Sequence, residues 1–140
     1  MLTGSNYDDT EERTGGGRNG YGSKLTNIFS TKFVVSCADG VNEYEQVFCD
    51  NMKTKNEPKI KKSKKNYTQI SFTPDYSRFG LEKLDETHLA MFLRRICDIT
   101  AFTGVKVYYN DVMVPIKNFK DYISLYENID EVFYEKIDNY

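Results

Sequence analysis

Residues 14–30 place a run of glycines directly before a segment with helical periodicity, and this combination constrains the fold more than any other feature. Five glycines fall within the eight residues from Gly15 to Gly22. Each glycine weakens regular structure by roughly 0.5–1 kcal/mol relative to alanine. From Tyr21 onward, Leu25, Ile28 and Phe29 share one face at the i, i+3, i+4 spacing of a helix. The segment therefore predicts a loop whose backbone approaches another group closely, followed at once by a helix.

Length and composition are those of one ordinary folded domain. The chain has 140 residues, of which 39% are hydrophobic and 29% charged. No apolar run is long enough to span a bilayer, and the first residues lack the pattern of a secretory signal. The net charge of −2 argues against a stand-alone nucleic-acid binder. Because Cys37, Cys49 and Cys97 are widely spaced, we expect three free thiols and no zinc site.

Alternating apolar residues predict several strands. Strands are expected over 31–37 and 43–49, joined by a turn, and over 67–72. The lysine-rich segment 51–66 is interpreted as a polar connection. A tight hairpin is expected around Asn110 and Asp111, a dipeptide that accepts the backbone of a short turn.

Two further helices are predicted in the second half of the chain. One begins after Asp85, a suitable N-cap, and ends at Gly104; its apolar stripe comprises Leu89, Phe92, Leu93 and Ile96. The other begins near Asn118, and its apolar face comprises Phe119, Tyr122, Ile123 and Tyr126. The order of elements predicts an α+β fold, with a mixed, largely antiparallel sheet and helices on one face.

The glycine loop fits none of three common phosphate-binding templates. Gly15, Gly17 and Gly20 match GxGxxG, but no buried strand precedes them, as a dinucleotide fold requires. The order Gly22-Ser23-Lys24 is not that of a P-loop, and a kinase loop lies between two strands. What remains is an anion site at a helix N-terminus, with the cations Arg18 and Lys24 at either end. A flexible surface loop ahead of a helix is the alternative.

The amino-acid sequence of this segment resembles that of a known family. "SNYDD", followed after an acidic spacer by "GGRNGYGSKLTNIFST", closely resembles the ATP lid of eukaryotic type II DNA topoisomerases. These enzymes share their ATPase fold with gyrase, heat-shock chaperones, histidine kinases and mismatch-repair proteins. The resemblance continues through "SFTPDYSRFG", "LRRICDI" and "NFKDYISLY", and so covers nearly the whole chain in order. It implies a partial two-layer ATPase fold of the Bergerat type.

The resemblance implies which residues bind ATP. Ser5 and Asn6 would contact the nucleoside, and main-chain N–H groups of Asn19 to Lys24 would meet the β- and γ-phosphates. Two residues depart from the family: Gly4 stands where serine is common, and Ser23 where alanine is usual. The complete set implied by the resemblance is Gly4, Ser5, Asn6, Gly17, Arg18, Asn19, Gly20, Tyr21, Gly22, Ser23 and Lys24.

The family's other catalytic groups are expected outside this chain. The glutamate base, the magnesium-binding asparagine and the adenine-binding aspartate lie upstream of the lid in the family, and the γ-phosphate-sensing lysine lies downstream. Residues 1–126 would therefore be the C-terminal part of the ATPase domain, and residues 127–140 an acidic tail or the start of the next domain. We expect no catalytic residue and no metal ligand within the chain.

The resemblance also implies what the whole protein does. It would be a nuclear, homodimeric, ATP- and Mg²⁺-dependent topoisomerase that binds DNA and not membranes, whereas the fragment alone would be inactive. The alternative is a catalytically inactive α+β module, from a truncated copy, that binds an anion or a partner.

Other polar residues have simpler interpretations. His88 is expected to be solvated or to take part in capping, and Arg94 and Arg95 to be surface charges or partners of nearby acids. Tyr122 and Tyr126 are expected to pack against neighbouring elements. The acidic residues Asp8, Asp9, Glu11 and Glu12, and the lysines between Lys53 and Lys65, are expected to be solvated.

Overall fold

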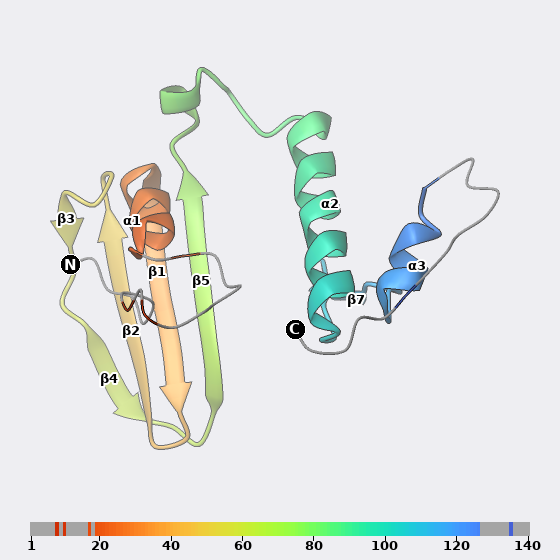
Figure 1. Cartoon of the computed structure of the whole chain (residues 1–140). Helices are drawn as coiled ribbons and strands as arrows, with labels where there is room; N and C mark the ends of the chain where they lie inside the picture. The colour runs from red at the N-terminus through yellow and green to blue at the C-terminus, as the bar shows by residue number, and fades with distance from the viewer. Residues whose placement is uncertain (1–7, 9, 11–16, 18, 127–134, 136–140) are drawn as a thin grey trace. The chain divides into compact units, whose positions relative to one another are not determined.

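The computed structural model describes residues 8, 10, 17, 19–126 and 135. The chain divides into two compact units, Met1–Glu82 and Lys83–Tyr140. Each unit has its own secondary structure, and the two are described separately (Figure 1). Length and composition pointed to one domain with a single core, so this division was not predicted.

The first unit is built on an antiparallel sheet. Strand β1 (Ser30–Asp39) forms a hairpin with β2 (Asn42–Cys49), and β5 (Asn66–Pro74) pairs along the other edge of β1. Two short strands, β3 (Thr54–Lys55) and β4 (Lys59–Lys62), pair with β2, and the strand order is β3-β2-β1-β5 with β4 off this path. The turn of the hairpin is stabilised by Asp39, whose carboxylate accepts hydrogen bonds from the N–H groups of Val41 and Asn42. The predicted hairpin and third strand are confirmed.

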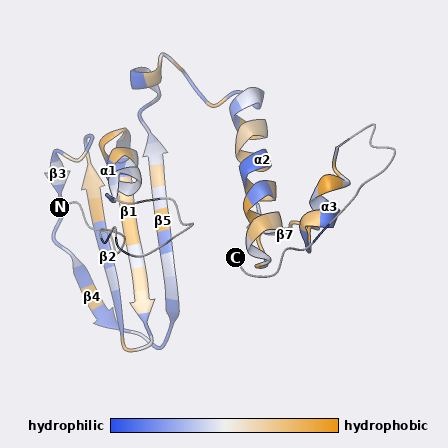
Figure 2. Cartoon of the chain, viewed as in Figure 1, coloured by the Kyte–Doolittle hydropathy of each residue, from blue (hydrophilic) through white to orange (hydrophobic). Residues whose placement is uncertain are grey.

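Strands β3 (Thr54–Lys55) and β4 (Lys59–Lys62) correct the interpretation of segment 51–66 as a plain connection. Both pair antiparallel with β2. Their side chains are exposed, so the sequence carries no alternating apolar signal there. The strands form because the outer edge of β2 offers main-chain partners, and lysines are common on such edges. Figure 2 shows the contrast between the hydrophilic β4 and the more hydrophobic β1.

Helix α1 (Tyr21–Ile28) packs on β1 and β5, directly before β1 begins. Phe33, in the first half of β1, forms the centre of a small core, and its side chain is only 3% exposed. Its ring centroid lies 6.4 Å from those of Phe48 and Phe72, its partners on the two neighbouring strands. Burial of one such side chain contributes about 1.5–3 kcal/mol. Phe72 itself is 52% exposed, so the apolar face of the sheet is only partly covered within the described residues.

The second unit contains α2 (Glu86–Thr103), a short hairpin of β6 (Tyr108–Tyr109) and β7 (Val112–Met113), and α3 (Phe119–Ile123). The expected boundaries hold: Asp85 caps α2, Gly104 ends it in the left-handed conformation, and Asn118 caps α3. Asn110 and Asp111 both have positive φ, as the tight hairpin requires.

The α+β class predicted from the sequence is confirmed by these elements. Cys37, Cys49 and Cys97 are free, as expected. Within the part of the chain that the structure describes, no helix is both long enough and apolar enough to cross a membrane.

Candidate functional site

The predicted phosphate loop leads into α1 through a glycine in the left-handed conformation. Gly20 occupies the N-cap position with φ 66° and ψ 21°, and Gly17 has φ 69°. Residues with a Cβ atom rarely adopt the left-handed backbone conformation, which explains why glycine stands at both positions. Gly20 has no side chain with which to cap the helix. The first turn of α1 therefore begins without the side-chain acceptor that most helices provide.

The backbone of this turn is open to approach. In an α-helix the first four N–H groups have no partner within the helix, and here these belong to Gly20, Tyr21, Gly22 and Ser23. A Cβ placed on Gly22 would meet no atom within 4 Å. Gly22 is thus not required for packing within the described residues. The absence of its side chain leaves the main-chain donors accessible from outside.

The charge around the first turn favours an anion. The helix dipole places about half a positive charge at the N-terminus. No acidic residue lies in the first turn of α1, and the half-buried Lys24 follows it directly. The site assembled from consecutive residues, Asn19 to Lys24, therefore combines main-chain donors with one ammonium group.

The remaining predicted ATP-binding residues fall into two groups. Gly17 is described and exposed. Gly4, Ser5, Asn6 and Arg18 lie outside the described residues, so their predicted role in binding ATP stays a prediction. The boundary proposed between residues 126 and 127 likewise falls at the edge of the described part.

Sequence reasoning missed a polar cluster at the opposite end of α1. It consists of Asn51, Asp75, Ser77 and Arg78, and the Asp75 carboxylate accepts a hydrogen bond from each of the other three. The hydroxyl of Ser77, followed by the Asn51 amide and the Arg78 guanidinium, lowers the pKa of Asp75. The local signals in the sequence are the spacings of Ser77 and Arg78 from Asp75, whereas Asn51 is 24 residues away.

Several polar side chains at the start and along the length of α2 make hydrogen bonds or ion pairs. The Asp85 carboxylate accepts a hydrogen bond from the main-chain N–H of His88 at 2.9 Å. Oδ1 of Asp85 also lies 2.6 Å from Nδ1 of the His88 ring. His88 therefore takes part in capping, as expected. Arg95 pairs with Asp98 at 3.3 Å, and Arg94 donates to the hydroxyl of Tyr126.

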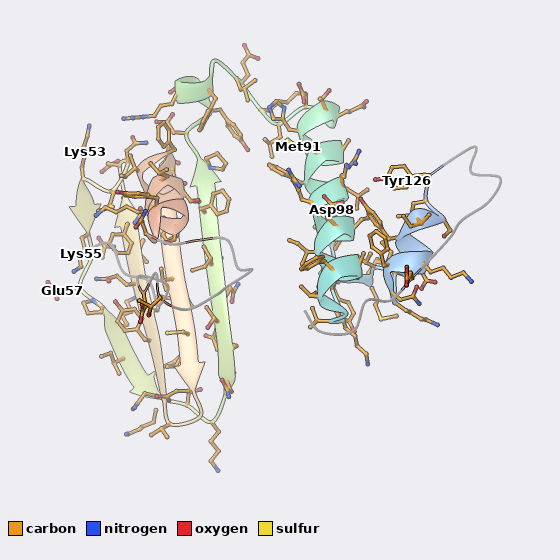
Figure 3. The ribbon with its side chains drawn as sticks, in the orientation of Figure 1. Lys53, Lys55, Glu57, Met91, Asp98 and Tyr126 are labelled. Carbon is orange, nitrogen blue, oxygen red and sulfur yellow. The ribbon has the colours of Figure 1, made fainter. Side chains whose placement is uncertain are left out.

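A hollow lies in the second unit, between α2 and α3. It has a volume of about 440 Å³ and is lined by Asp98, Ile99, Phe102, Phe119 and Tyr122, among others. Tyr122 donates to Asp98 at 2.5 Å and lies 2.9 Å from the hydroxyl of Tyr126. Hydrogen bonding to the Asp98 carboxylate, and then to Tyr126, raises the pKa of Tyr122. Asp98 and Tyr126 are labelled in Figure 3. The phenols hold α3 against α2, in line with the predicted packing role.

The lysine-rich segment forms an exposed edge. Lys53, Lys55 and Glu57 lie along it in Figure 3. Lys61 pairs with Glu43 at 3.2 Å, and Lys62 donates to the side chain of Asn42. Among the described residues no group of three or more His, Cys, Asp or Glu side chains could hold a metal ion.

Comparison with known proteins identifies the family of this site. No protein-family model matches the chain. Probable DNA topoisomerase 2 of Dictyostelium discoideum is 45% identical over 98% of the chain, and DNA topoisomerase 2 of Arabidopsis thaliana is 47% identical over 90%. The DNA topoisomerase 2 of Acanthamoeba polyphaga mimivirus is 46% identical over 90%. The chain spans only about a tenth of each of these proteins: 10%, 9% and 10%.

Solved structures agree with the sequence comparison. The ATPase region of Saccharomyces cerevisiae topoisomerase II matches 90% of the chain with a TM-score of 0.84 and 45% identity. The ATPase and transducer domains of the Balamuthia mandrillaris enzyme match 91% with a TM-score of 0.84 and 40% identity. In both cases the chain covers 35% of the solved structure. The chain thus has the fold of a topoisomerase ATPase region and belongs to that family. More particularly, the chain corresponds to about one third of the ATPase region of eukaryotic type II DNA topoisomerases.

Proposed function

We propose that the described loop and the first turn of α1 bind the phosphates of ATP within the ATPase region of a type II DNA topoisomerase. The observation that carries this proposal is the position of Gly20, which starts α1 in the left-handed conformation without a side-chain cap. The matching ATPase regions support the choice of ATP over other anions.

In the proposed complex this chain contributes electrostatic stabilisation and positioning. The N–H groups of Gly20 to Ser23 donate to phosphate oxygens, and Lys24 adds a full positive charge. Donors fixed before the reaction stabilise the charge that develops on the phosphates during hydrolysis, and they need no reorganisation at that moment. The nucleoside end of ATP is assigned to Ser5 and Asn6, as the family resemblance implies.

Other parts of the reaction are assigned to residues beyond this set. As the family resemblance implies, we place the ligand of Mg²⁺ and the general base in the part of the ATPase region that this chain does not cover. Passage of one DNA duplex through another, homodimer formation and a nuclear location are proposed for the whole protein, on the basis of its eukaryotic relatives.

The proposal is tested by comparing how Lys24→Ala changes the binding of ATP and of adenosine. The measurement uses a polypeptide extended to span the ATPase region of its relatives, in which ATP and adenosine binding are compared by calorimetry. Lys24→Ala should weaken ATP binding by about tenfold, the value of one charge-assisted hydrogen bond near 1.5 kcal/mol. Adenosine binding should not change, because adenosine carries no phosphate. Equal losses for the two ligands would refute the assignment of the phosphate site.

A further inference from the structure

The C-terminal end of α1 is held by two segments that are distant in sequence. The N–H of Asp75 donates to the carbonyl of Phe29, the C-cap residue, at 2.8 Å. The N–H of Asn51 donates to the carbonyl of Ser30 at 3.1 Å. The end of the helix is thus bonded through the main chain to the turn after β2 and to the residue that follows β5.

Side chains connect these two segments to each other. Asn51 Nδ2 donates to Asp75 Oδ2 at 3.0 Å, which closes a ring of contacts around the end of α1. Ser77 and Arg78 donate to the same carboxylate at 2.6 and 3.2 Å. The side chain of Asp75 is only 15% exposed. We name the group formed by Asn51, Asp75 and Arg78 the helix clasp.

Aromatic contacts add to the helix clasp. The guanidinium of Arg78 lies over the ring of Phe29, 5.7 Å from its centroid, while it also pairs with Asp75. The ring of Phe79 lies 5.4 Å from that of Phe29. The C-cap side chain of α1 is therefore held by the short helix η1 (Tyr76–Phe79).

The turn that supplies Asn51 has an unusual backbone. Asp50, Asn51 and Met52 have φ values of 54°, 57° and 67°, so three successive non-glycine residues are left-handed. Such a conformation persists only where the surrounding structure holds it, and it often occurs at functional sites. Here the hydrogen bonds from Asp50 to Thr31 and from Asn51 to Ser30 hold the turn against the start of β1.

Apart from its packing on β1 and β5, helix α1 is only partly covered by the described residues. Asn27 is its one buried residue, and Oδ1 of that side chain has no hydrogen-bond partner there. Tyr21 and Leu25 are 54% and 49% exposed. The main-chain hydrogen bonds that join this region to other described segments lie at the C-terminal end of α1.

We propose that Asn51 and Asp75 are positioning residues for the phosphate site at the other end of α1. Eight residues make a helix about 12 Å long, so a tilt of about 10° at the clasp moves the first turn by roughly 2 Å. Misplacement by about 1 Å can reduce the rate of an enzyme reaction by roughly 10²-fold. The helix clasp thus sets where the N–H groups of Gly20 to Ser23 point. This inference rests on the proposed function.

Amide hydrogen exchange of the 140-residue chain tests the clasp without nucleotide. Asn51→Gly removes the bridging amide but keeps a residue that accepts positive φ, and Asp75→Asn weakens the acceptor. Each variant should increase exchange at the amides of residues 24–28 by about fivefold, the value of one hydrogen bond near 1 kcal/mol. Exchange in β1 and β2 should not change. Asp39→Asn is the matched control, because Asp39 also accepts two local hydrogen bonds, at the far turn of the same sheet.

Titration with tripolyphosphate, followed by NMR at the amides of residues 20–23, tests the link to the phosphate site. Asn51→Gly should raise the half-saturating concentration by about fivefold, whereas Asp39→Asn should not. If exchange in α1 is unchanged in Asn51→Gly, or if exchange rises equally throughout the sheet, the clasp is refuted. If exchange rises in α1 alone but tripolyphosphate shifts none of these amides in the unaltered chain, the hold on the helix is supported and the proposed phosphate site is refuted.

Discussion

Helix α1 begins at a left-handed glycine, whereas α2 begins at an aspartate whose side chain accepts a hydrogen bond from the first turn. The start of α3 resembles that of α2, since Asn118 accepts from the N–H of Asp121. A capping side chain bonds one of the first N–H groups of its own helix. A helix without such a cap leaves that group accessible to an anion. If α1 binds phosphate as proposed, the residue at its start separates its role from that of α2 and α3.

The largest effect is expected from a side chain placed over the open turn of α1. Gly22→Val should reduce ATP binding by the extended polypeptide about 10- to 100-fold, as expected for loss of one charge-assisted hydrogen bond of about 1.5–3 kcal/mol. The cause is steric, since a branched side chain blocks the main-chain donors. The fold should tolerate it, because a Cβ at this position meets nothing within 4 Å.

Gly22→Ala is the matched control for this experiment. Its single methyl group should cost less binding than valine, and circular dichroism should show both variants folded. Binding by Gly22→Val at the unaltered level would show that α1 does not receive the phosphates.

A smaller effect is expected when α1 is given a start like that of α2. Gly20→Asp and Gly20→Asn differ only in charge, and both residue types tolerate the left-handed conformation better than most. The aspartate places a negative charge at the helix N-terminus, where it competes with phosphate. The dissociation constant of the aspartate variant for ATP should exceed that of the asparagine variant by about two- to fivefold. This factor corresponds to the roughly 0.3–1 kcal/mol by which one charge interacts with the helix dipole. If the two variants bind ATP equally well, the charge at the start of α1 does not influence phosphate binding.

The start of α2 should respond to pH. The N–H of His88, and then its side chain, lower the pKa of Asp85 below its ordinary value of 3.8. The capping contribution is therefore present above pH 3.8 and is lost as the pH falls below that value through the folded-state pKa. Thermal unfolding should show a drop of a few degrees for the second unit on acidification.

Asp85→Asn supplies the control for the pH experiment, because an amide accepts the same hydrogen bond but does not titrate in this range. If the variant shows the same acid-induced loss as the unaltered chain, the cap is not its cause. Phosphate binding at α1 should be unaffected by the substitution.

The smallest effect is expected from the lysines of the sheet edge. Replacing Lys61, Lys62, Lys64 and Lys65 with glutamine should leave ATP binding unchanged, because these residues do not belong to the α1 loop. Lys61 and Lys62 already contact side chains of β2. A loss of affinity for DNA in this variant, with a shallower dependence on salt, would show that the edge binds a nucleic-acid backbone.

The features that the sequence predicted depend on local rules. Asp85 and Asn118 were recognised as caps because a capping residue bonds to an N–H group three residues away. The proposed phosphate loop was inferred from consecutive residues and stays a prediction. Strand β4 was missed because its stability comes from the main chain of β2 and not from its own pattern. The helix clasp was missed because the contact between Asn51 and Asp75 exists only once β1 has brought both segments together.

The start of α1 has a consequence for the acid–base behaviour of the proposed site. Its donors are main-chain amides, which neither gain nor lose a proton across the range in which proteins are stable. Any change of affinity with acidity in that range must come from the ligand's own phosphates or from groups outside the first turn. Apart from substitution to proline, a change of side chain cannot delete such a donor. Natural variants that lose the main-chain part of the proposed site would therefore carry changes that alter the backbone conformation or its accessibility, as at Gly20 or Gly22.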